Sequence, residues 1–309
     1  MAVLFYSSVM AAEPWRDALL AREPGLDFRI HPAFGAADEI DCLLAWRPPS
    51  GTFARLPRLK LIYCTGAGVD QLFSDPELPA DLPIARLVDP DQGNEMAAYV
   101  MAVVLARHRE LERLRDQQRA GVWQMPPYRY VTDLRIGVMG LGALGALAAS
   151  RLALCGFPVA GWSRGPKQVA GVESFVGADG LGPFLARTDM LVCLLPLTPE
   201  TNGILNAALF RQLPPGAYVV NAARGHHVVD ADLIASLDSG HLAGATLDVF
   251  RTEPLPASHP FWAHPKIAVT PHVASLAKPD SVAEQILDNL GRLARGAPLL
   301  NQVDRQAGY

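Results

Sequence analysis

Short apolar runs, each bounded by proline, glycine or polar residues, recur through the first 92 residues. Stretches of helical character separate them, and this alternation is typical of βα units in a small parallel sheet. The predicted strands are Val3–Tyr6, Phe28–His31, Cys42–Trp46, Leu61–Cys64 and Ile84–Leu87.

The same alternation returns in the second part of the chain and predicts a second parallel, doubly wound sheet. Its expected strands are Ile136–Met139, Val159–Trp162, Met190–Leu195, Tyr218–Asn221, Gly244–Asp248 and Ile267–Thr270. The tail 280–295 has apolar residues at helical spacing, so we expect it to pack back on the first domain. The predicted division is therefore 1–94 with 274–309 for one domain and 95–273 for the other.

Between the two sheets, residues 95–118 read as one long helix with an apolar first half and a second half rich in arginine and glutamate. Such a helix begins buried and ends at the surface. Its first half carries more apolar surface than one domain needs. We therefore expect a homodimer with twofold symmetry, the commonest arrangement of two copies.

A glycine motif, Gly140-x-Gly142-x-x-Gly145, follows the apolar run 134–139 and precedes a predicted helix. In a strand–turn–helix unit, these glycines allow the tight turn, the approach of a pyrophosphate and close packing of the helix. The helix N-terminus then offers free N–H groups to the anion. The motif predicts dinucleotide binding; the alternative is a glycine-rich turn with no ligand.

The residues that distinguish the two nicotinamide dinucleotides point to a phosphorylated ribose. An NAD site usually carries an acidic residue about 20 positions after the motif, yet no carboxylate occurs between Asp133 and Glu173. Ser163, Arg164 and Lys167 stand there instead, and charged donors of this kind suit a 2′-phosphate. We expect NADP(H) to be preferred, with NAD(H) possible; a solvated basic loop is the alternative.

Composition narrows the class of protein further. The chain has 309 residues, 50% of them apolar, and a formal net charge of −4, which gives no support for a nucleic acid or a membrane as partner. Its four cysteines are widely spaced in apolar segments, without the spacing of metal ligands. We therefore interpret the cysteines as free thiols of a protein in a reducing cytoplasm. The first twelve residues lack the basic start of a signal peptide and are better explained as a buried strand.

Four polar residues follow predicted strands of the second domain: Arg224, Asp248, Glu253 and His272. Because ligands of open α/β sheets bind beyond the carboxyl ends of the strands, we expect these residues to share one edge. Singly, each is more often a surface or turn residue. Together they predict an active site.

At this point the chain resembles the D-isomer-specific 2-hydroxyacid dehydrogenases. The resemblance rests on the glycine motif and on three later segments: Asn221-Ala-Ala-Arg-Gly, Leu247-Asp-Val-Phe with Glu253-Pro254, and Thr270-Pro-His272. With the alternation above, it implies an α/β fold of two doubly wound parallel-sheet domains, a Rossmann cofactor domain inserted in a flavodoxin-like substrate domain.

Four further segments are similar to the glyoxylate/hydroxypyruvate reductase A branch of that family. They are Trp46-Arg-Pro-Pro, Gly66-Ala-Gly-Val-Asp70, Arg224-Gly-His-His-Val-Val and the ending Gln302-Val-Asp-Arg-Gln-Ala-Gly-Tyr309. Relative to the generic family pattern, His226-His227 lengthens the loop between Arg224 and Asp230 by one residue. We interpret both histidines as loop residues, with contact between one of them and substrate as the lesser alternative.

The resemblance implies a role for each polar residue. His272 would be the general acid, because imidazole titrates near working pH, and Glu253 would orient it and stabilise its protonated form. Arg224 would bind the substrate carboxylate and polarise the carbonyl. Asp248 would hold the nicotinamide carboxamide.

Other contacts follow from the same resemblance. Backbone N–H groups of Ala67, Gly68 and Val69 would complete the carboxylate site, and the bulky Trp46 would leave room only for a small substituent. The expected cofactor contacts are Gly140, Leu141, Gly142, Ala143, Leu144, Gly145, Ser163, Arg164, Lys167, Leu195, Pro196, Thr201, Ala222 and Asp248. No metal is expected.

The resemblance implies NADPH-dependent reduction of small 2-keto acids, glyoxylate to glycolate and hydroxypyruvate to D-glycerate. Which of these acids is the physiological substrate is left open. The alternatives are a phosphoglycerate, lactate-type or phosphite dehydrogenase of the same family, and a non-catalytic protein that senses the cofactor. A formate dehydrogenase is disfavoured because that branch has glutamine in place of Glu253.

Overall fold

The structure is a computed structural model that describes residues 1–73 and 75–305. Position 74 and the last four residues of the ending motif, 306–309, lie outside the described residues. The chain folds into two compact units, one formed by Met1–Gln92 with Leu276–Tyr309 and the other by Gly93–Ser275. The second unit is thus an insertion in the first.

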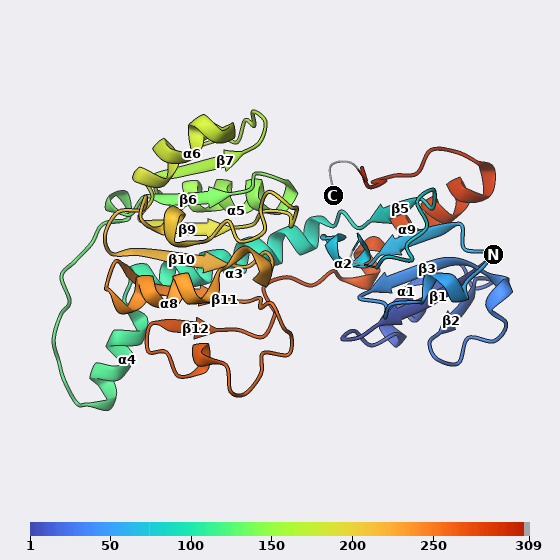
Figure 1. Ribbon diagram of the computed structural model, residues 1–309, viewed down its shortest axis with the longest axis horizontal. Helices are drawn as coiled ribbons and strands as arrows, with labels where there is room; N and C mark the ends of the chain where they lie inside the picture. Colours follow the sequence, from blue (N-terminus) through green and yellow to red (C-terminus); the bar gives the residue numbers. More distant parts are fainter. Residues whose placement is uncertain (74, 306–309) are drawn as a thin grey trace. The chain divides into compact units, whose positions relative to one another are not determined.

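The first unit contains a five-stranded sheet in the order β2-β1-β3-β4-β5, and all its strand pairs are parallel (Figure 1). This is the flavodoxin-like order, as predicted. The strands are β1 (Ala2–Ser7), β2 (Asp27–Ile30), β3 (Ile40–Trp46), β4 (Leu61–Cys64) and β5 (Ile84–Arg86). The helices are α1 (Glu13–Leu20), α2 (Asp70–Phe73) and α9 (Pro279–Arg295), with 3₁₀ turns η1 (Ala37–Glu39) and η2 (Phe53–Arg55).

The tail helix α9 packs on the sheet of the first unit, as its apolar spacing predicts. Val282, Ile286 and Leu290 are buried in the same core cluster as Trp15 and Leu19 of α1. Helix α9, near the end of the chain, therefore shares a core with α1, near its beginning.

The second unit contains a seven-stranded parallel sheet in the order β12-β11-β10-β9-β6-β7-β8. Its strands are β6 (Ile136–Met139), β7 (Val159–Ser163), β8 (Val172–Val176), β9 (Met190–Cys193), β10 (Ala217–Asn221), β11 (Leu242–Leu247) and β12 (Ile267–Val269). The order is that of a Rossmann fold with one added strand, and the chain reverses direction across the sheet between β6 and β9. Ligands of such sheets bind at that point.

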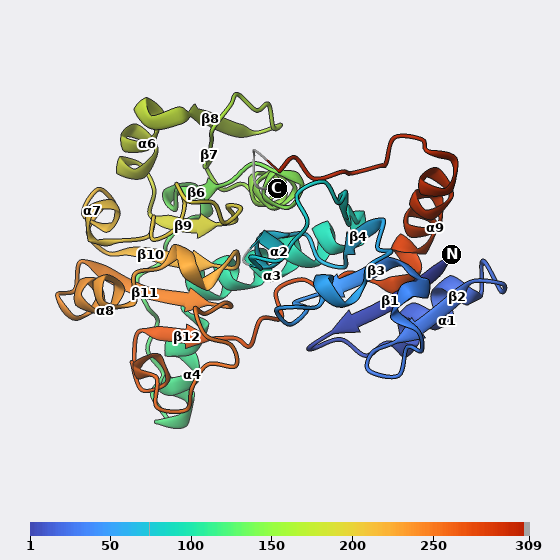
Figure 2. The ribbon, with the colours of Figure 1, turned by 45° about the vertical axis from the view of Figure 1, so that its right-hand side comes forward.

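Helices cover both faces of this sheet. They are α3 (Pro90–His108), α4 (Leu111–Arg119), α5 (Ala143–Leu154), α6 (Gly177–Ala186), α7 (Ala207–Phe210) and α8 (Asp230–Asp238), with 3₁₀ turns η3 (Val131–Asp133), η4 (Gly225–His227) and η5 (Pro260–Trp262). Buried side chains of α3 and α5 form one core cluster, and those of α6, α7 and α8 form another on the opposite face (Figure 2).

Two elements differ from the prediction. Strand β8 was not expected, because it pairs only with β7 and its residues are half-buried or exposed, so its sequence lacks an apolar run. The prediction of a single helix over 95–118 is wrong. The helix is interrupted at Glu110, whose backbone is left-handed at φ 51°, and the following helix α4 contains no buried residue.

Within the described residues, we find no helix with both the length and the apolar character needed to cross a bilayer.

Candidate active site

The glycine motif forms the turn from β6 into α5, and two of its glycines are required by close contacts. Gly140 is left-handed at φ 98°, and a Cβ on it would lie 2.7 Å from the carbonyl oxygen of Leu194. A Cβ on Gly145 would lie 1.8 Å from the oxygen of Gly140. Both positions therefore exclude a side chain and hold α5 close to the sheet.

Gly142 differs, because a Cβ there would meet no heavy atom within 4 Å. It is exposed and forms the N-cap of α5, and no side chain caps this helix end. The N-terminus of α5 therefore presents backbone N–H groups to open space. These residues fit a pyrophosphate.

The loop after β7 carries the three residues predicted to meet a 2′-phosphate. Ser163 is buried and its hydroxyl donates to the carbonyl oxygen of Gly165 at 2.8 Å, which tightens the turn. Arg164 and Lys167 are exposed on that turn. Their contact with a 2′-phosphate stays a prediction.

Several predicted cofactor residues have their side chains in the core. Leu141, Leu195 and Ala222 are buried. They can meet a ligand chiefly through backbone atoms. Ala143 is exposed and Leu144 half-buried at the start of α5.

Thr201 shapes the turn that follows β9. Its hydroxyl donates to the carbonyl oxygen of Pro196 at 2.7 Å and accepts the N–H of Thr198 at 2.8 Å. The predicted contacts Pro196 and Thr201 thus belong to one hydrogen-bonded turn.

His272 and Glu253 form the acid–base pair that the sequence suggests. The Nδ1 of His272 lies 2.8 Å from the Oε2 of Glu253, and Glu253 Oε1 accepts the N–H of Phe250 at 2.9 Å. Because a carboxylate can only accept, Nδ1 is the donor and carries a proton. The pair is partly buried: the His272 side chain is 26% exposed and that of Glu253 is 13% exposed.

The backbone of His272 is left-handed at φ 54°, a conformation that costs energy for a residue with a Cβ. Its N–H donates to the carbonyl oxygen of Asp248 at 2.8 Å and approaches that of Thr270 at 3.1 Å. These contacts hold the turn that presents the imidazole.

Asp248 is 1% exposed, and its carboxylate is used within the protein. It accepts from Thr270 Oγ1 at 2.5 Å and from the N–H groups of Val273 and Ala274 at 3.0 and 2.9 Å. Tyr99 of α3 donates to Thr270 Oγ1 at 2.7 Å, since that hydroxyl already donates to Asp248. Asp248 therefore orients the His272 turn, a role the sequence did not reveal.

Burial raises the pKa of Tyr99 to about 12, so its hydroxyl remains protonated and serves as a fixed donor. Thr270 and Tyr99 extend the support of Asp248 from β12 to α3. The contact of Asp248 with the nicotinamide stays a prediction beside this role.

Arg224 lies in the loop after β10, the strand next to β11. Asn221 Nδ2 donates to the carbonyl oxygen of Arg224 at 2.8 Å, and the Nδ1 of His227 lies 3.2 Å from the N–H of Arg224. A Cβ on the next residue, Gly225, would lie 1.9 Å from the carbonyl carbon of Phe250. The Arg224 loop thus packs directly on the loop that leads to Glu253.

Parallel pairing of β10, β11 and β12 brings the four predicted polar residues to one edge of the sheet, as expected. His272 contacts Glu253 through its ring and Asp248 through its backbone N–H. Sequence reasoning missed Asn221, Thr270 and His227. Asn221 and Thr270 are the first residues of two of the motifs, but their positions in the sequence do not reveal which groups their side chains bind.

Of the predicted substrate residues in the first unit, Trp46 is the last residue of β3, and Ala67, Gly68 and Val69 follow β4. The indole of Trp46 packs on Gly66, where a Cβ would lie 1.9 Å from the ring, and the Arg47 guanidinium lies 5.8 Å from the ring centre. Gly66 is therefore needed for contact with Trp46.

In the same loop, the Val69 side chain belongs to the core. Ala67 and Gly68 are half-buried, and the carbonyl oxygen of Gly68 accepts from the Cys64 thiol at 3.3 Å. The binding of a carboxylate by these backbone N–H groups stays a prediction.

Comparison with known proteins fits this geometry. The family model of the D-isomer specific 2-hydroxyacid dehydrogenase NAD-binding domain matches residues 101–274. The chain is 39% identical to glyoxylate/hydroxypyruvate reductase A of Yersinia enterocolitica and 41% identical to that of Photorhabdus laumondii, with 100% of each protein covered.

Two solved structures extend the likeness to the fold. A D-isomer specific 2-hydroxyacid dehydrogenase from Xanthobacter autotrophicus Py2, in complex with NADPH and MES, has 47% identity and a TM-score of 0.93 over 100% of this chain and 99% of its own. The NADPH-dependent glyoxylate/hydroxypyruvate reductase of Sinorhizobium meliloti, in complex with NADP and sulfate, has 38% identity and a TM-score of 0.93, with 100% of each chain covered. This chain therefore belongs to the D-isomer specific 2-hydroxyacid dehydrogenase family.

Proposed function

We propose that this protein reduces glyoxylate and hydroxypyruvate to glycolate and D-glycerate with NADPH. The observation that carries the proposal is the His272–Glu253 pair, which lies with Arg224 beyond the carboxyl ends of β10 to β12. The full-length likeness to two reductases of this name supports the substrate class. The basic turn at Arg164 and Lys167 supports the choice of NADPH.

When bound, the reduced nicotinamide supplies a hydride for the substrate carbonyl carbon. The dinucleotide would be held at the N-terminus of α5 by the glycine motif. On our proposal, Arg164 and Lys167 hold the phosphorylated ribose. The protein's own residues orient the substrate and supply the proton for its carbonyl oxygen.

His272 donates the proton that the carbonyl oxygen needs. Since Nδ1 is engaged with Glu253, the other ring nitrogen, Nε2, is the one that can face a substrate. Protonation of the ring makes Nε2 a donor, and the adjacent carboxylate stabilises that charged form. After transfer, the neutral ring keeps its Nδ1 proton and its contact with Glu253.

Arg224 binds the carboxylate of the keto acid through its guanidinium, whose two-pronged geometry matches a carboxylate. We propose that the backbone N–H groups of Ala67, Gly68 and Val69 add to this binding. Trp46 restricts the substituent next to the carbonyl. Pocket fit discriminates by about 1–3 kcal/mol per methylene, so pyruvate and longer keto acids are poorer substrates without being excluded.

The test is a panel of keto acids assayed with NADPH and with NADH. The proposal expects the highest kcat/KM with glyoxylate or hydroxypyruvate and NADPH, and a large loss of kcat in His272→Ala. A higher kcat/KM with phenylpyruvate or a branched keto acid would move the protein to another branch of the family. Absence of turnover with every acid, with NADPH still bound, would favour the cofactor-sensing alternative.

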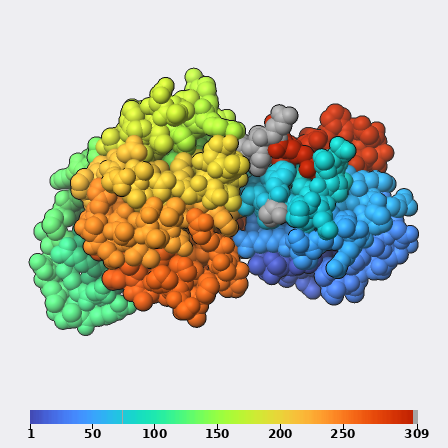
Figure 3. All heavy atoms as spheres, in the orientation of Figure 1, coloured from blue at the N-terminus to red at the C-terminus, as the bar shows by residue number. Residues whose placement is uncertain are grey.

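We also propose a homodimer, supported by an apolar segment at the surface of the second unit. After α4 the chain runs along the outside of this unit as an extended arm, residues 121–130 (Figure 1). Trp123 is fully exposed, and Met125, Tyr128 and Tyr130 are 64–84% exposed. Soluble monomers rarely expose apolar groups together in this way, and such patches mark interaction sites. Figure 3 shows this part of the chain, in green, on the flank of the unit.

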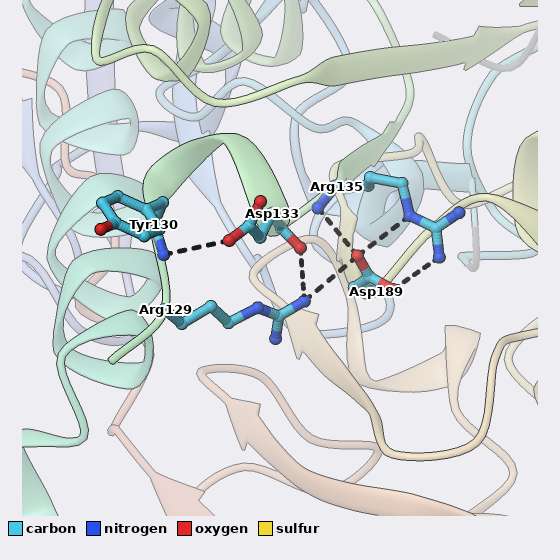
Figure 4. Close-up of polar contacts among 5 residues, drawn as sticks. All are labelled: Arg129, Tyr130, Asp133, Arg135 and Asp189. Carbon is cyan, nitrogen blue, oxygen red and sulfur yellow. Dashed lines mark hydrogen bonds and ion pairs between the residues drawn. The ribbon is translucent and has the colours of Figure 1, made fainter. Parts of the chain in front are cut away.

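The arm is anchored at its end by an ion-pair cluster (Figure 4). Arg129 donates to the carbonyl oxygen of Asp133 at 2.7 Å and reaches Asp189 at 3.4 Å, while Arg135 binds both oxygens of Asp189. The aromatic side chains are therefore presented from a fixed base.

Sedimentation of wild type and of the double variant Trp123→Ser, Met125→Ser tests the homodimer. The expected result is a dimer that dissociates in the variant. Leu154→Ser, an equally exposed apolar change on α5, serves as the control and leaves the dimer intact. A 33 kDa species for the wild type at micromolar concentration would contradict the proposal.

A reducing, cytoplasmic location is a further part of our proposal. It is supported by the cysteines, since none of Cys42, Cys64, Cys155 and Cys193 forms a disulfide in the part of the chain that the structure describes.

A further inference from the structure

Two adjacent histidines in the loop after β10 have opposite environments. His226 is exposed, whereas His227 is fully buried at 0% exposure in the 3₁₀ turn η4. The ring of His227 lies between two predicted ligand-binding segments. Its Nδ1 is 3.2 Å from the N–H of Arg224, and its Nε2 is 3.3 Å from the carbonyl oxygen of Pro196.

The hydrogen-bond partners determine which ring nitrogen carries the proton. Pro196 offers only a carbonyl oxygen, so Nε2 must be the donor there. Nδ1 also lies 3.0 Å from the carbonyl oxygen of Arg224. That oxygen already receives Asn221 Nδ2 at 2.8 Å and the N–H of His227 at 3.2 Å. Nδ1 is therefore left to accept the N–H of Arg224, and the ring is neutral with its proton on Nε2.

The surrounding backbone fixes the ring in this position. The N–H of Leu205 donates to the carbonyl oxygen of His227 at 2.9 Å, and the N–H of Val229 donates to that of Leu205 at 3.0 Å. The N–H of Gly203 donates to the carbonyl oxygen of His226 at 2.8 Å. Hydrogen bonds thus join the segment 203–205 to the η4 turn, and the His227 imidazole extends from that turn to Pro196.

We propose that His227 is a positioning residue with two contacts. It fixes the backbone of Arg224, the proposed substrate-binding residue, and it fixes the turn at Pro196, a proposed cofactor contact. Through Nδ1 it fixes the backbone of Arg224, and therefore the point from which the arginine side chain extends. Through Nε2 it fixes Pro196, which shares a turn with Thr201. The inference rests on the proposed roles of Arg224 and Pro196.

Two conservative variants separate the two contacts. The oxygen of asparagine takes the place of Nδ1, so His227→Asn keeps an acceptor for Arg224 and loses the donor to Pro196. The amide of glutamine takes the place of Nε2, so His227→Gln keeps the donor to Pro196 and loses the acceptor. A lost hydrogen bond of this kind corresponds to about a 2- to 10-fold change in affinity.

The experiment measures the Kd for NADPH by fluorescence and the KM for glyoxylate, with thermal unfolding of each variant. We expect His227→Asn to raise chiefly the Kd for NADPH, and His227→Gln to raise chiefly the KM for glyoxylate. His226→Gln is the matched control and changes neither value. Equal changes in both constants for both variants, or no change in either, would overturn the proposal.

Failure of both variants to fold would also overturn the proposal, because His227 would then serve folding alone. Arg224→Lys in the same assays separates this inference from its basis. If that variant keeps the wild-type KM for glyoxylate, the proposed role of Arg224 is wrong, whatever the His227 variants do.

Discussion

Replacement of Asp248 by asparagine tests the structural support of the acid–base pair. The carboxylate accepts three hydrogen bonds in a fully buried setting, from Thr270 Oγ1, Val273 N and Ala274 N. Asparagine has only one accepting oxygen. Val273 binds one carboxylate oxygen and Ala274 the other, so in either orientation the NH₂ group of asparagine faces a backbone N–H.

The cost follows from these contacts. A hydrogen bond to a charged group contributes about 1.5–3 kcal/mol, and a buried donor left without an acceptor costs about 1–3 kcal/mol more. We therefore expect Asp248→Asn to lower the free energy of unfolding by about 2.5–6 kcal/mol, a large part of the roughly 5–15 kcal/mol typical of a folded protein. Because the N–H of His272 binds the carbonyl oxygen of Asp248, kcat should fall as well.

Urea unfolding followed by circular dichroism measures this loss at a fixed m-value. Thr270→Val is the comparison variant: it removes one donor to Asp248 and the acceptor of the Tyr99 hydroxyl. It keeps both backbone bonds to the carboxylate and places no NH₂ group against a backbone N–H, so it should cost less. A loss below about 1 kcal/mol for Asp248→Asn would refute the reasoning, since an unsatisfied N–H alone costs that much.

Three further predictions concern charge. Glu253→Gln should shift the high-pH fall of keto-acid reduction to lower pH, because the amide no longer stabilises the protonated His272; an unchanged pH–rate profile would contradict this. Burial disfavours the Asp189 carboxylate, but hydrogen bonds and charge from Arg135 outweigh it and lower its pKa. The stability it adds is present above the usual value of 3.8 and is lost as pH falls through the lower folded pKa, so the difference from Asp189→Asn in urea unfolding should shrink at acid pH and not grow. Arg164→Asp should raise KM for NADPH by at least tenfold and leave that for NADH nearly unchanged, since a charged hydrogen bond contributes about 1.5–3 kcal/mol; equal kcat/KM for both cofactors in the wild type would refute the assignment.

The sequence predicted every strand of the two sheets except β8, because most of these strands are buried on both faces. Strands β3 and β4 are wholly or nearly wholly buried, and such strands read as continuous apolar runs. Strand β8 was missed for the complementary reason. As an edge strand with exposed Glu173 and Ser174, it carries no apolar run that could reveal it.

The site was predictable only as far as strand ends determine position. Arg224, Asp248 and His272 each follow a strand, so parallel pairing alone brings them to one edge. The support around them depends on contacts between loops, and sequence spacing does not encode these. His226 and His227 are the same residue type at adjacent positions, yet one is exposed and the other is buried against Arg224 and Pro196.

The break at Glu110 changes the grounds for expecting a dimer. The apolar residues Met96, Val100 and Val104 of α3 are not spare surface, because they are buried in the core of their own unit. The exposed apolar groups lie further on, in the arm 121–130. Substitutions at the two places should therefore act differently: a polar residue at Val100 would destabilise the fold of the second unit, whereas a polar residue at Trp123 would weaken association and leave the monomer folded.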